Sequence, residues 1–451
     1  MVRTSSELEL MRKESERVMR QYAKLGAAPG IVWEKGEGAI LWDVEGKRYI
    51  DMSSGFFQCL SLGWGRKELI EAAYEQMKKI AFMATGQYFS SEMAIEYSKE
   101  LIDVLPGNMK HVVFTNDGTG SNEIAVKIAR MYWNAQGQAG KYKVLCLSHS
   151  YHGASHFAAS LMGFSDSRLP YGIEFPGIVR MPNYHCYKCP FGLNYPSCNL
   201  QCAKFVEWTI QQEGENSIAC MIAETIQGVG GYIWPCDEYW PMVAKILREH
   251  NILLISDEVQ NGFCRTGKFW GVNHWNTVPD LLTMGKGINS NYLPLGAVGV
   301  GDKVFDVVRG QMLAWGSTSS GNPTVLATGR AALKIYKEEK LDERAAKLGE
   351  HIHNRLVKEF LPLPCVDDVM GRGLYQSFAV ALNKTTGNKV SQEAQEKAGE
   401  SICAKLFSKG VIARLEHNRR VAVIPSLIIG EDELDTALDT MRDVMSEVKP
   451  V

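Results

Sequence analysis

Apolar runs alternate with amphipathic stretches between about residue 110 and residue 300. Residues 122–136 and 238–251 carry apolar side chains at three- and four-residue spacing, the period of a helix with one buried face. The apolar runs have the length of buried strands, and they lie at residues 111–116, 142–148, 218–224, 252–258 and 297–301. This alternation predicts an α/β fold, in which helices cover both faces of a largely parallel sheet.

The two ends of the chain follow a different pattern. Residues 30–51 place the turn signals GEG and EGK between strand-like runs, which predicts a β-hairpin or meander. From about residue 325 the chain is rich in helical patterns, with strand-like pieces at 377–382 and 421–429. A chain of 451 residues exceeds what one core usually serves. We therefore expect a large domain over residues 61–320 and a smaller α+β domain formed by residues 1–60 and 321–451.

Composition and charge narrow the range of functional classes to which the protein can belong. Hydrophobic residues make up 45% of the chain and charged residues 22%, which is ordinary for a globular protein. The net charge is −2 without a long block of one sign, so no nucleic-acid or membrane surface is expected. The N-terminal stretch is charged and lacks the apolar core of a signal peptide. We expect a cytoplasmic protein without a transmembrane helix.

The chain has eleven cysteines, which we expect to be free thiols in a reducing compartment. Four of them, Cys186, Cys189, Cys198 and Cys202, gather in a turn-rich segment near residues 185–202. A C-x2-C pair followed by a C-x3-C pair is compatible with a zinc site. An insertion packed by small apolar thiols explains the pattern equally well, and the sequence leaves both alternatives open.

Candidate ligand-binding groups follow several of the predicted strands, where the binding groups of open parallel sheets collect. Gly118, Thr119 and Gly120 open directly into a helix, and backbone N–H groups at such a start bind phosphate. The third glycine of a dinucleotide fingerprint and a Walker lysine are both absent, which argues against a nicotinamide dehydrogenase. Tyr151 follows the strand at 142–148, where its ring is placed either to stack on a flat ligand or to pack in the core.

The next strands contribute a carboxylate and an amine. Asp257 ends an apolar run, so it needs a partner: either a structural arginine such as Arg265, or a protonated ring nitrogen of a ligand. Lys286 stands between Gly285 and Gly287 after another apolar run, and an apolar pocket makes an amine a nucleophile toward carbonyls. We expect the two glycines to let the backbone pass close to a flat cofactor. A phosphate cradle, an aromatic ring, a carboxylate and a lysine are the set that holds pyridoxal 5'-phosphate.

The chain resembles the class III aminotransferases, which are fold type I pyridoxal-phosphate enzymes. The resemblance covers nearly the whole chain, and within the family the chain looks most like the ω-transaminases that use pyruvate. It implies a mainly parallel seven-stranded sheet in the large domain. It also implies a homodimer or tetramer with the active site at the subunit interface. The motifs that carry it are DEVQNGFCRTGKFWG (257–271), PDLLTMGKGINSNYLPLGAV (279–298), FTNDGTGSNEIAVKIAR (114–130), SYHG (150–153), ETIQGVGG (224–231) and GSTSSGNP (316–323).

The resemblance also implies roles for individual residues. Lys286 forms the Schiff base and moves a proton between substrate and cofactor, and Asp257 keeps the pyridinium nitrogen protonated. Thr318 reaches the phosphate bound by the partner subunit. The other implied cofactor contacts are Gly118 and Thr119 at the phosphate, Tyr151 and Val259 on the two ring faces, and Glu224 and Gln260 around them. One departure is Asp117, which places a carboxylate beside the phosphate cradle, and a helix cap that points away from the phosphate is one interpretation of it.

Only a few single positions in the sequence indicate the substrate. The position at which ornithine-type members carry a carboxylate-binding arginine falls near Ala422, so an α-carboxylate donor is not expected. By resemblance, Arg414 clamps the carboxylate of pyruvate and swings away for a donor without one, and Phe57 and Trp64 wall the pocket. Segments 42–57 and 62–77 favour taurine, β-alanine or a similar ω-amino donor. An amino-acid racemase or decarboxylase on the same cofactor is the alternative, because it keeps Lys286 and Asp257.

Overall fold

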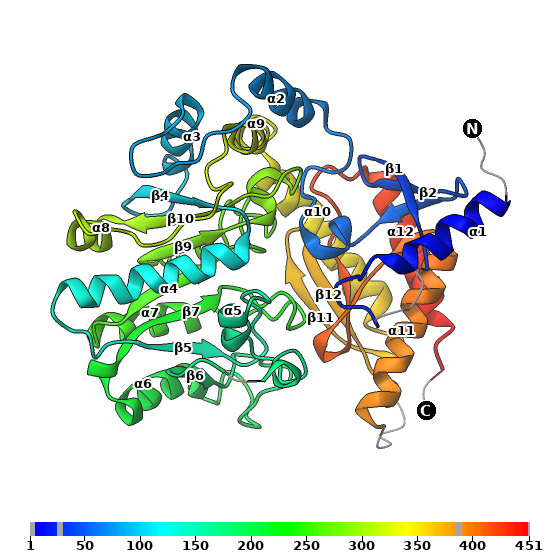
Figure 1. Ribbon diagram of the computed structural model, residues 1–451. Helices are drawn as coiled ribbons and strands as arrows, with labels where there is room; N and C mark the ends of the chain where they lie inside the picture. Colours follow the sequence, from blue (N-terminus) through cyan, green and yellow to red (C-terminus); the bar gives the residue numbers. More distant parts are fainter. Residues whose placement is uncertain (1–4, 25–29, 173, 385–389, 450–451) are drawn as a thin grey trace.

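A computed structural model describes residues 5–24, 30–172, 174–384 and 390–449 (Figure 1). A seven-stranded sheet forms its centre, with the strand order β4-β10-β9-β8-β7-β5-β6. All neighbouring strands are parallel except β10, which is antiparallel to both β4 and β9. The strands are β4 (Met109–Thr115), β5 (Lys143–Leu147), β6 (Ile178–Met181), β7 (Ile218–Glu224), β8 (Leu253–Asp257), β9 (Leu281–Met284) and β10 (Gly296–Gly301). The expected α/β fold is confirmed, although β6 was not predicted because its four residues, IVRM, include an arginine.

Helices cover both faces of this sheet, which explains why the strands read as continuous apolar runs. Helix α4 (Gly118–Ala135) crosses one face, where it packs with Val144 and Cys146 of β5 (Figure 1). Helices α6 (Gln201–Glu213) and α7 (Tyr239–Glu249) pack on the other face with Leu145 and Leu147. Successive residues of one strand thus enter different cores, as the alternation of side chains along a strand requires.

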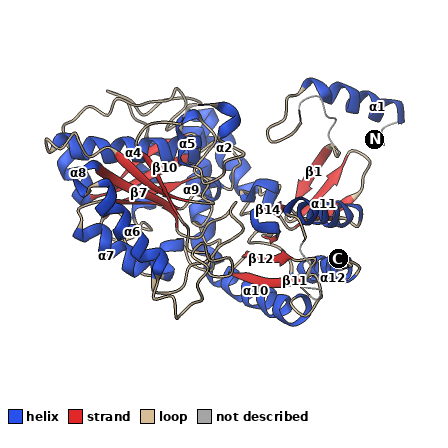
Figure 2. Ribbon diagram, turned by 90° about the horizontal axis from the view of Figure 1, so that it is seen from below, coloured by secondary structure: helices blue, strands red, loops and turns tan. Residues whose placement is uncertain are grey.

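The two chain ends meet in a pair of smaller sheets beside the central one (Figure 2). The predicted N-terminal meander forms antiparallel strands, and its last strand, β3, pairs in parallel with β13 from the C-terminal part. The first sheet has β1 (Trp33–Glu37), β2 (Ile40–Asp43), β3 (Arg48–Asp51) and β13 (Val411–Ile412). The second has β11 (Val366–Arg372), β12 (Tyr375–Val380), β15 (Arg420–Val423) and β14 (Leu415–Glu416). The expected smaller α+β part built from both chain ends is confirmed.

The remaining helices are α1 (Ser5–Glu14), α2 (Lys67–Lys79), α3 (Glu92–Ile102), α5 (His156–Leu161), α8 (Asp302–Val308), α9 (Pro323–Glu338), α10 (Leu341–Arg355), α11 (Gln392–Ser408) and α12 (Glu431–Ser446). Within the described ranges, none of the helices has the length and apolar character needed to cross a membrane. The domain boundaries at residues 60 and 320 stay a prediction, and residues 1–4, 25–29, 385–389 and 450–451 of the predicted segments lie outside the described residues.

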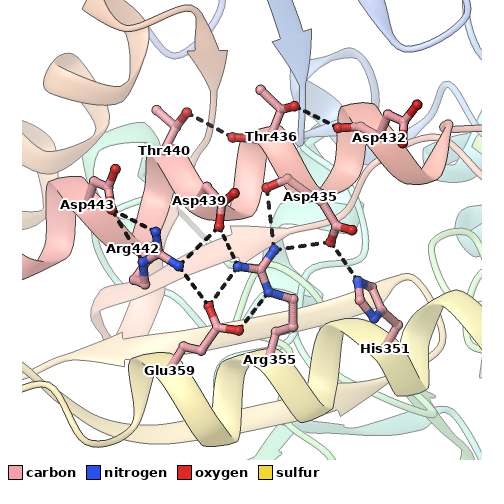
Figure 3. A network of polar contacts seen from close by, with 10 residues as sticks. All are labelled: His351, Arg355, Glu359, Asp432, Asp435, Thr436, Asp439, Thr440, Arg442 and Asp443. Carbon is pink, nitrogen blue, oxygen red and sulfur yellow. Dashed lines mark hydrogen bonds and ion pairs between the residues drawn. The ribbon is translucent and has the colours of Figure 1, made fainter.

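An ion-pair network joins the end of α10 to α12 (Figure 3). Arg355 lies at its centre and binds both carboxylate oxygens of Glu359, at 2.9 and 2.7 Å. The same guanidinium reaches Asp435 at 3.1 Å and Asp439 at 2.6 Å. Its side chain is only 13% exposed, so solvent screens these pairs less than it screens ordinary surface pairs. The network fixes the C-terminal helix against the smaller part of the molecule.

Candidate active site

Three strand ends bring the predicted chemistry to one edge of the central sheet. Glu224 ends β7 and Asp257 ends β8, and the register of the two strands places these residues side by side. Asp257 is also opposite Thr283 of β9. Only Gly285 separates the end of that strand from Lys286. The carboxyl ends of parallel strands therefore gather the acid and the amine, as the sequence predicted.

Asp257 is buried and surrounded by hydrogen-bond donors. Its Oδ2 accepts from His152 Nδ1 and from Asn122 Nδ2, both at 2.7 Å, and its Oδ1 accepts from Val259 N at 3.1 Å. Arg265, the alternative partner considered from the sequence, instead donates to two backbone carbonyls and two serine hydroxyls elsewhere. Among the described residues no arginine or lysine forms an ion pair with this carboxylate, which leaves it available to a cationic ligand.

Lys286 occupies an enclosed position next to this carboxylate. Burial lowers the pKa of its amine, while the carboxyls of Glu224 and Asp257 oppose that shift. Cys59, from the N-terminal part, also faces this amine. Burial raises the pKa of the Cys59 thiol, and Lys286 acts in the opposite direction. A lysine with a lowered pKa keeps a larger neutral fraction, which is the form that attacks an aldehyde.

The glycines flanking Lys286 serve the packing of the protein, and the expectation that they let the backbone pass close to a flat cofactor stays a prediction. A Cβ on Gly285 would lie 3.0 Å from the backbone nitrogen of Gly118. A Cβ on Gly287 would lie 2.9 Å from the Phe263 side chain. Gly285 thus lets the lysine segment lie directly against the start of α4, which places the amine next to the predicted phosphate cradle.

Helix α4 begins at Gly118, so the residues predicted to bind phosphate lie in its first turn. Asp117 is the N-cap residue, and its carboxylate accepts from Gly120 N at 2.7 Å. This acid therefore caps the helix, and the N–H groups of Gly118 and Thr119 keep no intrahelical partner. A Cβ on Gly118 would lie 2.6 Å from Val259, so only glycine lets these two segments approach so closely.

Glu224 fixes the loop that carries Tyr151. Its two carboxylate oxygens accept from Tyr151 N at 2.8 Å and from Gly228 N at 2.7 Å. Burial, with a smaller contribution from the neighbouring Asp257, raises the pKa of Glu224 to about 7. The Tyr151 hydroxyl lies 2.9 Å from that of Tyr22, which belongs to the N-terminal segment. Tyr22 was not predicted, because the residue stands in a polar stretch far from every motif.

Arg414 lies over the predicted Phe57 and its neighbour Phe56. Its guanidinium is 5.1 Å from the ring centroid of Phe56 and 5.6 Å from that of Phe57, and Nη1 donates to the Phe56 carbonyl at 3.0 Å. Arg414 also influences the pKa of Lys286, which places the two cations in the same region. The Phe57 ring lies 6.5 Å from that of Tyr22, so the N-terminal segment contributes to this wall.

Two side chains in this region were missed by sequence reasoning. Glu416 pairs with Arg414 Nε at 2.9 Å, and Gln58 donates to the same carboxylate at 2.7 Å. Gln58 in turn accepts from Gln260, one of the predicted cofactor contacts. Gln58 directly follows the predicted Phe57, and Glu416 lies two residues after the predicted Arg414, but an uncharged amide and a carboxylate without a motif gave no separate reason to single them out.

Two predicted site residues have other surroundings among the described contacts. Trp64 pairs through its backbone with Gly38, and its ring fills the space in front of Gly36, so it packs on the N-terminal sheet. Thr318 is exposed on the loop before α9, and its neighbour Ser317 accepts from Asn116 at 2.6 Å. The predicted contact of Thr318 with a partner subunit stays a prediction.

The cysteine-rich segment contains free thiols in the structure. All eleven cysteines are unpaired, and Cys236, which lies outside the segment, is hydrogen-bonded to Cys186. Among the residues that the structure describes, no group of three or more histidine, cysteine or carboxylate side chains is arranged to hold a metal ion. Metal analysis of protein purified without chelator is the direct test of the zinc alternative.

The residues gathered here fit pyridoxal 5'-phosphate. A helix start with free N–H groups is suited to its phosphate, and an amine with a lowered pKa is suited to its aldehyde. A buried carboxylate that pairs with no arginine or lysine among the described residues is suited to a protonated ring nitrogen.

Comparison with known proteins agrees with this chemistry. The family described as Aminotransferase class-III matches residues 22–445. This chain belongs to the class III aminotransferases. It is 31% identical to the putrescine–pyruvate aminotransferase of Pseudomonas aeruginosa, over 94% of this chain and 92% of that protein.

Solved structures of this family have the same fold. A thermostable (S)-enantioselective omega-transaminase from Thermomicrobium roseum is 34% identical, with a TM-score of 0.92 over 99% of both chains. The omega transaminase of Pseudomonas jessenii, solved in complex with PMP, is 29% identical, with a TM-score of 0.92 over 97% of this chain and 98% of that one. As a class III aminotransferase, this protein uses pyridoxal 5'-phosphate and acts on an amine and a 2-oxo acid. The fold type I prediction is confirmed.

Proposed function

We propose that this aminotransferase transfers the amino group of an ω-amino acid or amine, such as taurine or β-alanine, to pyruvate. The observation that carries the proposal is Arg414, which lies over Phe56 and Phe57 in the neighbourhood of Lys286. A guanidinium recognises a small carboxylate through two parallel hydrogen bonds. The Pseudomonas aeruginosa relative, whose name gives pyruvate as its acceptor, supports the same choice.

The proposed roles follow from the contacts. Pyridoxal phosphate, when bound, supplies the aldehyde that receives the amino group and a ring that withdraws electrons. Lys286 holds it covalently between turnovers, then removes a proton from the donor carbon and returns it on the cofactor side. Asp257 keeps the ring nitrogen protonated, and His152 and Asn122 keep that carboxylate in place.

The other proposed contacts surround the ring and the phosphate. Gly118 and Thr119 bind the phosphate through the start of α4, and Thr318 reaches the phosphate of a partner subunit in a homodimer or tetramer. Tyr151 and Val259 enclose the ring from its two faces. Glu224 and Gln260 support these residues through their hydrogen bonds to Tyr151 and Gln58. Phe57 walls the donor pocket. We place the enzyme in the cytoplasm.

A donor panel tests the proposal. Purified holoenzyme is mixed with single donors, and the loss of the absorbance of the bound cofactor is followed without acceptor. We expect rapid amination by ω-amino acids and amines, followed by formation of alanine when pyruvate is added. Rapid amination by α-amino acids such as ornithine, with none by ω-amines, would contradict the proposed donor class. Racemised or decarboxylated product without a keto product would favour the alternative reactions.

A further inference from the structure

The cysteine-rich segment, residues 185–202, is tied to the stretch of chain that leads into α7. The ring of Tyr184, directly before this segment, lies 4.8 Å from the ring of Tyr239 in α7, and both rings are buried. Within the segment, the Tyr195 hydroxyl donates to the carboxylate of Glu238, with both oxygens at 3.0 Å. These contacts hold side by side two loops that follow different strands, β6 and β7.

Two thiols meet where these loops touch. Cys186, from the cysteine-rich segment, is hydrogen-bonded through its side chain to Cys236, from the stretch before α7. The backbone of Cys236 is held as well, because its carbonyl accepts from Tyr239 N at 3.2 Å. The Cys236 side chain also packs, together with that of Cys202, on the apolar core beneath α6 and α7. The fold therefore makes Cys186 and Cys236 neighbours before any reaction takes place.

The two thiols have different environments. Cys186 is exposed, whereas Cys236 is half-buried. Their shared hydrogen bond lowers the pKa of Cys186 and raises the pKa of Cys236. The nearby Cys189, Cys198 and Cys202 oppose the lowering through their charges. An accessible thiolate beside a protonated thiol is the arrangement in which one sulfur attacks an oxidant and the other resolves the product.

We propose that Cys186 and Cys236 form a peroxide-sensitive pair of thiols, which oxidation joins in a disulfide. The Cys186 thiolate attacks one oxygen of hydrogen peroxide, so that an S–O bond forms, the O–O bond breaks and hydroxide leaves. This hydroxide takes the proton of the Cys236 thiol and becomes water. The Cys236 thiolate then attacks the sulfenic sulfur, an S–S bond forms, the S–O bond breaks, and the second hydroxide is protonated by solvent. The two sulfurs are oxidised to the disulfide, and the peroxide is reduced to water.

Peptide mapping of the oxidised holoenzyme tests the proposal. The full-length protein is reduced, freed of reductant and treated with hydrogen peroxide, and its remaining thiols are alkylated before digestion without reductant. We expect one linked peptide pair, Cys186 with Cys236, whose mass is lower by two hydrogen atoms and which dithiothreitol separates again. Cys186 should be consumed at least about tenfold faster than Cys403, a thiol of α11 whose pKa burial raises.

Single substitutions separate the two roles. Cys236→Ser should stop the reaction at the sulfenic acid of Cys186, which dimedone traps. Cys186→Ser should leave Cys236 reduced under the same conditions, because the attacking thiolate is then absent. Cys198→Ser is the matched control. Cys198 lies in the same segment, and this variant should form the disulfide within about twofold of the wild-type rate.

Three results would overturn the inference. The first is a disulfide that joins any other pair of cysteines, and the second is loss of Cys186 no faster than loss of Cys403. The third is zinc in the purified protein that peroxide releases in step with loss of Cys186, since both thiols would then be metal ligands. The wild-type peptide map decides between these results even where Cys186→Ser does not fold. None of the readouts requires turnover, so they hold whatever amine the enzyme accepts.

Discussion

Asp257→Asn is the sharpest test of the active site, because it changes one charge and almost no volume. Asp257 is 3% exposed, and one of its oxygens accepts two hydrogen bonds of 2.7 Å. The new amide keeps an oxygen for those donors, but its NH₂ group then faces Val259 N, which is also a donor. We expect a stability loss of about 1–3 kcal/mol for that mismatch. The larger effect is on turnover. Removing a preorganised charge from a dry site costs about 10²- to 10³-fold in kcat.

The assay compares this variant with Glu258→Gln. Glu258 is the adjacent buried carboxyl, but it bonds to Gly271 N and Val272 N, and burial raises its pKa to about 7. Glutamine there also turns its NH₂ group toward a backbone N–H, so it carries a stability cost similar to that of Asp257→Asn, and we expect kcat within about threefold of wild type. Turnover is measured at saturating substrates on protein shown to be folded and loaded with cofactor. If Asp257→Asn retains more than about a tenth of the wild-type kcat, the assigned role of Asp257 is wrong.

Three further predictions concern stability, each measured by urea unfolding. Gly118→Ala should lower the free energy of unfolding by about 1–3 kcal/mol, because its new methyl group meets Val259 at 2.6 Å. Adding Val259→Ala should recover most of that loss, and no recovery would contradict this packing. Arg355→Ala should lower the free energy of unfolding by about 1–3 kcal/mol, because it removes the ion pairs with α12. Lys334→Ala, at an exposed ion pair, should lower it by under about 0.5 kcal/mol. Equal losses in the two variants would refute the role of the network. Burial lowers the pKa of His274 to about 4, so the fold keeps this ring neutral while the unfolded chain protonates below about pH 6.5. Wild type should therefore lose about 2–3 kcal/mol more than His274→Gln as pH falls from 7 to 4, and parallel pH profiles would exclude this linkage.

Local patterns predicted the residues that follow strands. Lys286 and Asp257 stand at the ends of apolar runs, and parallel strands bring such ends together whatever the rest of the chain does. The same reasoning placed Gly118 at a helix start. The close approach of Gly287 to Phe263 was not predicted, because a glycine in a sequence does not show which surface it approaches.

Residues that act across long sequence separations could not be predicted in this way. Gln58 and Glu416 are 358 residues apart, yet they are joined by a hydrogen bond of 2.7 Å. Tyr22 reaches Tyr151 from a segment without any motif. No periodicity or spacing records such pairs, because they depend on how the two chain ends fold against the central sheet.

The sequence by itself determined the chemistry of this protein: a lysine, a carboxylate and a phosphate cradle at one sheet edge. Its hydrophobic periodicity specifies buried parallel strands, and the topology of such a sheet then brings their ends together. The tertiary structure alone decided the electrostatic state of the substrate region. Hydrogen bonds from Gln58 and Tyr232 hold Glu416 beside Arg414, and these contacts join distant segments in a way that the sequence order does not display.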